Sequence, residues 1–194
     1  MNLGPDINET LARARADLRI GVPVVLVSGG QGAVVMAAET ADAVRLNALQ
    51  ADGLKPVLAI TARRAETLKA RAYDGDLARI MLPEGADLRW VLAVADPKDD
   101  LATPMKGPLM TERHGNANLH RIAIALAKSA RILPAAVVVP VEDGRAFAVS
   151  HGLTCIDHTR AAPHLADRSA LHEVVAARLP MEVSEAGRLH VFRP

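Results

Sequence analysis

The residues of this sequence that could do chemistry are few and widely spaced. Lys106, Arg113 and Arg121 are candidates for holding a phosphate group, because both residue types donate charged hydrogen bonds to phosphate oxygens. The glycine-rich stretch 28–33 could cradle a phosphate with its backbone amides, but it lacks the lysine and the Ser/Thr of a P-loop. Its place between two apolar runs favours a tight hairpin turn instead.

Side chains that could bind a metal ion lack the usual spacing. A small acidic cluster of Asp96, Asp99 and Asp100 surrounds Pro97, and we interpret it as a solvated loop. The histidines of the last third of the chain are scattered, and we expect them at the surface: His151, His158 and His164. The sequence therefore predicts no metal site and no cofactor in this chain.

The elements that must position these residues follow one another in a mixed order. Apolar periodicity predicts helices over 6–19, 40–50 (capped by Thr40), 65–72, 86–94, 116–131 (capped by Asn116), 146–151 and 170–178. Short apolar runs predict strands over 24–27, 33–38, 57–60, 77–82, 136–139 and 154–156. Alternating polar and apolar residues predict a further strand over 188–192. The expected fold class is α+β, with a mixed β-sheet flanked by helices.

The composition narrows the partners and the location. With 194 residues, half of them apolar, the chain can bury a substantial core. The balance of 23 basic and 22 acidic residues predicts no nucleic-acid and no membrane partner. Its one cysteine, Cys155, is expected to be a small core residue rather than a nucleophile. The start of the chain has no signal-peptide pattern, so we expect a cytoplasmic location.

Four landmarks carry a resemblance to a known family. The segments GVPVVLV at 21–27, AAET at 37–40, DGL at 52–54 and the long stretch 99–152 come in the order found in dihydroxybutanone phosphate synthase of riboflavin biosynthesis. The chain resembles that family over roughly residues 18–160. The resemblance implies a synthase-like domain over residues 1–160, and homodimers.

The residues that would do the family's chemistry are replaced. The family's acidic run corresponds to 28–33, which has no carboxylate, and a further family glutamate falls on or near Pro140. The family's Arg-x-Gly-His-Thr-Glu pattern corresponds to 113–118, where Asn116 takes the place of the histidine. An amide cannot exchange a proton near neutral pH, and the neighbouring His114 would point in a different direction. We therefore expect no catalytic residue.

The end of the chain resembles a domain junction. Residues 177–194 look like the start of a GTP cyclohydrolase II domain, so 161–194 is expected to hold a C-terminal helix and a linker to, or first strand of, that domain. The cyclohydrolase needs a three-cysteine zinc site, so zinc is expected only in that further domain. The resemblance implies a cyclohydrolase domain in cis.

Two main hypotheses about function remain open, beside a third in which the chain is a free-standing regulatory protein unrelated to riboflavin biosynthesis. The first is a non-catalytic, structural and dimerising domain of a GTP cyclohydrolase II-like protein of riboflavin biosynthesis. The second is a phosphate-binding or residual enzyme module that uses the old cavity through Lys106, Arg113 and Arg121. On either hypothesis the chain alone is not expected to hydrolyse GTP.

Overall fold

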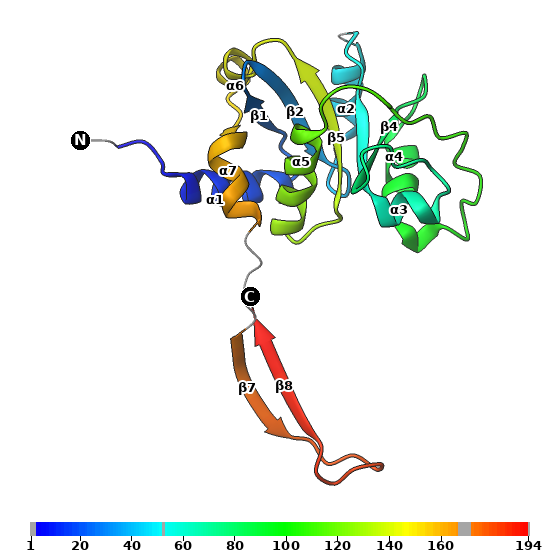
Figure 1. The fold of residues 1–194 in the computed structure, drawn as a ribbon, viewed down its shortest axis with the longest axis vertical. Coiled ribbons are helices and arrows are strands. Elements are labelled where there is room, and N and C mark those ends of the chain that lie inside the picture. The colour runs from blue at the N-terminus through cyan, green and yellow to red at the C-terminus, as the bar shows by residue number, and fades with distance from the viewer. Residues whose placement is uncertain (1–2, 52, 167–171, 194) are drawn as a thin grey trace.

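A computed structural model describes residues 3–51, 53–166 and 172–193 of the chain (Figure 1). Its helices are α1 (Ile7–Arg19), α2 (Ala43–Ala51), α3 (Ala62–Thr67), α4 (Leu88–Ala95), the short 3₁₀ helix η1 (Pro97–Asp99), α5 (Asn118–Ser129), α6 (Gly144–His151) and α7 (His158–Ala166). Its strands are β1 (Val24–Ser28), β2 (Gln31–Ala37), β3 (Val57–Thr61), β4 (Leu77–Met81), β5 (Ala135–Val141), β6 (Cys155–Asp157), β7 (His172–Arg178) and β8 (Arg188–Arg193).

The centre of the molecule is a mixed six-stranded sheet in the order β4-β3-β5-β2-β1-β6. Neighbouring strands are antiparallel except β1 and β6, which are parallel. The mixed sheet flanked by helices confirms the α+β fold class predicted from the sequence.

Both faces of this sheet are buried, which explains why its strands read as continuous apolar runs. On β1, Val24 and Leu26 face a core layer that includes residues of α1, α5 and α7. Val25 and Val27 face the opposite layer, which includes residues of α2, α3, α4 and α6. The alternation follows from the two-residue period of a strand.

The helix ends show where the sequence predictions need correction. Helix α1 begins with a full capping box, because Asp6 accepts from the Glu9 amide and Glu9 accepts from the Asp6 amide, both at 2.8 Å. Helix α2 begins later than predicted: Asp42 accepts from the Arg45 amide, whereas the predicted cap Thr40 donates to the Leu18 carbonyl.

Other predicted boundaries also shift. Helix α3 covers 62–67 rather than 65–72, because Thr61 caps it and accepts from the Arg64 amide. Helix α5 begins at Asn118, and the predicted cap Asn116 accepts from the Asn118 amide at 2.7 Å from a turn outside the helix. Helix α7 crosses the predicted domain boundary at residue 160 and packs through Ala161 on the core layer of α1 and α5.

The helix predicted over 170–178 is wrong. Residues 172–178 form β7, which pairs with β8 in a separate antiparallel hairpin, and 170–171 lie outside the described residues. Figure 1 shows this hairpin apart from the body of the molecule. The β-branched pair Val174 and Val175 and the cross-strand partner Val191 favour a strand over a helix here.

A close backbone contact joins β2 to α6. A Cβ added to Gly32 would lie 2.6 Å from both the Cα and the nitrogen of Gly144. We expect Gly32→Ala to lower the free energy of unfolding by about 1–3 kcal/mol, because backbone atoms cannot yield as a flexible side chain does. Urea unfolding followed by circular dichroism measures the change, with Ser28→Ala in the same hairpin as the control. A Gly32→Ala protein as stable as the unchanged chain would show that the helix moves away at little cost.

Among the described residues, no helix has both the length and the apolar character needed to cross a membrane.

Candidate functional site

The fold brings together three segments that are far apart in the sequence. Residues 30–33 of the β1–β2 hairpin, residues 114–116 before α5 and residues 140–142 at the end of β5 line one cleft. Its volume is about 520 Å³. These are the three places where the sequence resemblance puts replaced chemical residues, so a single cleft collects all three replacements.

The hairpin turn is tight and carries no ionisable side chain. Ser28 pairs with Gln31 across the turn, and the residues between them, Gly29 and Gly30, have φ values of +53° and +86°. Two consecutive positive φ angles are typical of a two-residue hairpin turn, which glycine adopts without strain. The predicted hairpin is confirmed, and its amides belong to a turn rather than to a helix N-terminus.

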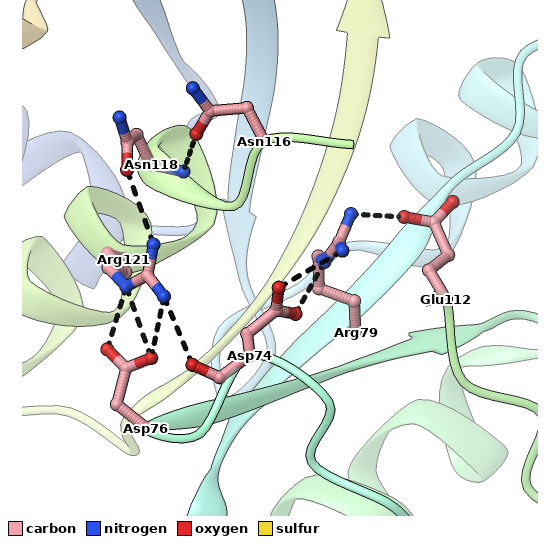
Figure 2. A network of polar contacts seen from close by, with 7 residues as sticks. All are labelled: Asp74, Asp76, Arg79, Glu112, Asn116, Asn118 and Arg121. Carbon is pink, nitrogen blue, oxygen red and sulfur yellow. Dashed lines mark hydrogen bonds and ion pairs between the residues drawn. The ribbon is translucent and has the colours of Figure 1, made fainter. Parts of the chain in front are cut away.

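A buried arginine forms one wall of the cleft. Arg79 of β4 is only 2 % exposed and donates to Asp74 at 2.8 Å and to Glu112 at 2.8 Å. Figure 2 shows its guanidinium between these two carboxylates. The positive charge of Arg79 is therefore neutralised by two carboxylates, so it does not favour the binding of a phosphate ester.

His120 of α5 also lines the cleft, at a buried position. It is 7 % exposed, and neither ring nitrogen has a hydrogen-bond partner among the described residues. Burial, and next the charge of Arg79, lowers the pKa of His120 to about 4. The imidazole is neutral at pH 7 and can act there as a hydrogen-bond donor and acceptor but not as a charge.

Arg121, one of the candidate phosphate-binding residues, lies on a different side of α5. It donates to Asp76 at 2.9 Å, to the Asp74 carbonyl and to the Asn118 side chain (Figure 2). Its hydrogen bond lowers the pKa of Asp76, and the same bond raises the pKa of Arg121. The Arg121 guanidinium is thus paired with the loop before β4, through Asp76 and the Asp74 carbonyl.

Lys106 is held in a second ionic cluster. Its ammonium pairs with Asp100, which also accepts from Arg64 at 2.8 Å. Arg64 is 9 % exposed and donates to the carbonyls of Val94, Ala93 and Asp96. The two cations hold the pKa of Asp100 well below its usual range, Arg64 having the larger effect. This cluster fixes the end of α4 and the loop that follows it.

Arg113 completes the predicted phosphate-binding set. Its guanidinium lies over the Tyr73 ring, 5.0 Å from the centroid. Neither it nor the other two residues of the set, Lys106 and Arg121, lines the cleft. The phosphate-binding role of the three residues stays a prediction, and the structure places them in three different local environments.

Three of the other residues singled out in the sequence, Asp96, His151 and Cys155, have structural contacts. Asp96 accepts from the Lys98 amide as the cap of η1, and His151 stacks on Phe147 with ring centroids 4.1 Å apart. Cys155 is half-buried against the core, and burial raises its thiol pKa. Within the described ranges, no group of three or more His, Cys, Asp or Glu side chains could hold a metal ion.

Sequence reasoning missed the residues that define the cleft best. Arg79 sits inside a strand between apolar residues, and His120 looks like part of the apolar face of α5. A charged residue in the middle of a buried strand is rare unless it is paired. Arg79 was therefore the one residue from which the sequence could have indicated a buried polar network here. No comparable pattern marks its partners Asp74 and Glu112, which come from loops.

Comparison with known proteins gives matches in sequence and in structure. No protein-family model matches the chain. In sequence it is 33% identical over 194 residues to GTP cyclohydrolase-2 of Azospirillum brasilense, covering 94% of this chain and 49% of that protein. The chain therefore spans about half the length of this curated relative.

Solved structures resemble nearly the whole chain. A two-domain 3,4-dihydroxy-2-butanone 4-phosphate synthase from A. baumannii aligns with a TM-score of 0.61 and 16% identity, over 94% of this chain and 65% of that one. The synthase of Candida albicans aligns with a TM-score of 0.58 and 16% identity, over 86% of this chain and 100% of that one. This chain has the dihydroxybutanone phosphate synthase fold.

A further solved structure is the synthase in complex with two magnesium ions, with a TM-score of 0.56 and 13% identity, covering 84% of this chain and 97% of that one. The synthase fold confirms the resemblance read from the landmark segments. The match to a GTP cyclohydrolase-2 agrees with the resemblance read from the end of the chain. Together they relate the chain to one cyclohydrolase in sequence and to the synthases in fold.

Proposed function

We propose that this chain is a non-catalytic, synthase-like domain with a structural and dimerising role in a GTP cyclohydrolase II-like protein of riboflavin biosynthesis. The observation that carries the proposal is the single cleft into which the three replaced segments converge. Enolisation of a sugar phosphate needs a positioned base and, in this family, carboxylates that hold magnesium. Around this cleft the hairpin turn offers glycines, and Asn116 offers an amide.

Three of the ionisable groups that line the cleft, Arg79, Glu112 and His120, support the same proposal. Arg79 and Glu112 neutralise each other in an ion pair, and the His120 nitrogens are buried. A general base must reach the proton that it removes and must have a pKa near the working pH. A buried imidazole whose pKa is about 4 is poorly suited to that task.

The hairpin of β7 and β8 supports a domain in cis. Four apolar residues share one face of the hairpin through their cross-strand pairs: Val175, Ala177, Leu189 and Val191. On the other face, the Glu173 carboxylate and His190 Nδ1 lie 3.0 Å apart, within hydrogen-bond distance. A two-stranded hairpin alone is at best marginally stable in water. We propose that it is part of the cyclohydrolase domain, which would hold the zinc ion, in a cytoplasmic homodimer that binds neither nucleic acid nor membrane.

A product assay tests the loss of catalysis. Purified protein is incubated with ribulose 5-phosphate and Mg²⁺, and formate is followed by proton NMR, with an active synthase as the positive control. We expect no formate above the rate without protein. To exclude a contaminating enzyme, any formate found is measured again with His114→Ala and Glu142→Gln. Formate production that these substitutions abolish would contradict the proposal.

The alternative is a ligand-binding module in the old cavity, which the persistence of a cleft of about 520 Å³ favours. Calorimetric titration with ribulose 5-phosphate and with GTP, each with and without Mg²⁺, separates the two functions. Saturable binding of either compound would favour the module over a purely structural domain.

A further inference from the structure

Several polar side chains at the cleft have no partner within the described part of the protein. Glu142, Gln31 and His114 line the cleft at solvent-exposed positions, and their side chains make no hydrogen bond or ion pair to another described residue. His120 also lines the cleft, but both of its ring nitrogens are buried and do not open into it. Exposed polar groups at the rim of a cleft can exchange their water for a polar ligand.

The charge of the cleft is negative. Arg79 is more than balanced, because it pairs with both Asp74 and Glu112. Glu142 is the other carboxylate of the lining, and it forms no ion pair with a described residue. An anion such as a phosphate ester would meet this charge with no free cation to offset it.

Apart from Asn116, the rest of the lining has apolar side chains or is glycine. The side chains of Leu119, Val138, Pro140 and Val141 contribute to the wall. An apolar wall with a few polar groups suits an organic molecule with a hydrophobic body. A metal ion fits poorly, since it needs several converging ligands and no such cluster exists among the residues that the structure describes.

We propose that the cleft binds a small organic cation, an amine or an amidinium on an apolar or aromatic body, with Glu142 as the charge partner and Gln31 and His114 as neutral hydrogen-bonding groups. This inference rests on the proposed loss of the synthase reaction, because it gives the cavity a ligand of the opposite charge to a sugar phosphate. His120 and the apolar wall form the inner part of the site.

Three probes of the same shape test the charge preference: benzamidine, benzamide and benzoate. Their affinities are measured by calorimetry and by ligand-observed NMR at pH 7.5, with inorganic phosphate and Mg²⁺ as further probes. We expect benzamidine to bind about tenfold more tightly than benzamide, because a charged hydrogen bond is worth about one factor of ten more than a neutral one. Benzoate and phosphate should bind least.

Two matched variants locate the effect. Glu142→Gln keeps the shape of the side chain and should remove the difference between benzamidine and benzamide. Glu66→Gln makes the same charge change on α3, at an exposed residue outside the cleft, and should leave the difference intact. Equal binding of the three probes, absence of saturable binding, or a preference that survives Glu142→Gln would each overturn the inference.

The outcome is independent of the product assay. Formate production would contradict the proposed loss of catalysis whatever the cation measurements give. A protein that makes no formate but prefers benzoate or phosphate would agree with the structural role and would contradict the cation site.

Discussion

Replacing Arg79 with methionine is expected to lower the free energy of unfolding by about 3–5 kcal/mol, because it leaves two carboxylates without their shared buried cation. The side chain of Arg79 is 3 % exposed, and that of Asp74 is 13 % exposed. Methionine keeps much of the length and the apolar stem of arginine, so it leaves little cavity. The loss of unfolding free energy therefore measures the contribution of the ion pairs. Urea unfolding followed by circular dichroism measures it.

Arg121→Met is the matched control. Arg121 also holds an aspartate, Asp76, but the two side chains are 40 % and 57 % exposed. An exposed ion pair contributes at most about 1 kcal/mol, so this variant should change stability little. If Arg79→Met does not fold, the triple change with Asp74→Asn and Glu112→Gln, which removes the stranded charges, should recover folding. Equal losses at Arg79 and Arg121 would show that the buried network does not stabilise the fold.

Acid is expected to destabilise the protein through His120, by about 3 kcal/mol in total. The folded-state pKa of His120 is about 4, below the ordinary value of 6.5 for a free histidine. Between these two pH values the unfolded chain binds a proton that the folded chain rejects, so stability falls as the pH falls from about 6.5 to about 4. Above the higher value both states are neutral and this cost is absent.

Unfolding free energies measured from pH 7.5 down to pH 4 test this expectation. His120→Leu should reduce the loss of unfolding free energy between pH 6.5 and pH 4 by about 3 kcal/mol. It should also raise stability at neutral pH by about 1 kcal/mol, because two unpartnered nitrogens are removed. His164→Gln, at an exposed position of α7, is the control and should retain the fall. If His120→Leu loses as much stability in acid as the unchanged protein, the loss comes from other groups and the expectation is wrong.

The tail shows how tertiary context overrides a local pattern. Residues 170–178 carry enough alanine and leucine to look helical, yet 172–178 pair with β8 along their length, with one irregularity between Glu173 and Val175. The alternation of 188–192 predicted its strand correctly, because period two appears in the sequence itself. The pairing of β7 depends on a distant partner, and periodicity within a short window does not contain it.

The sequence by itself determined the α+β class, the synthase resemblance, the glycine hairpin and the identities of the replaced residues at 28–33, 116 and 140. Each depends on residue type and local order, which are written in the chain. Only the tertiary structure decided that these segments form one cleft, that Arg79 and His120 line it, and that Lys106 and Arg121 are already paired with carboxylates. Those facts depend on contacts between residues far apart in the chain, where burial and charge pairing are set by the packed fold rather than by any single segment.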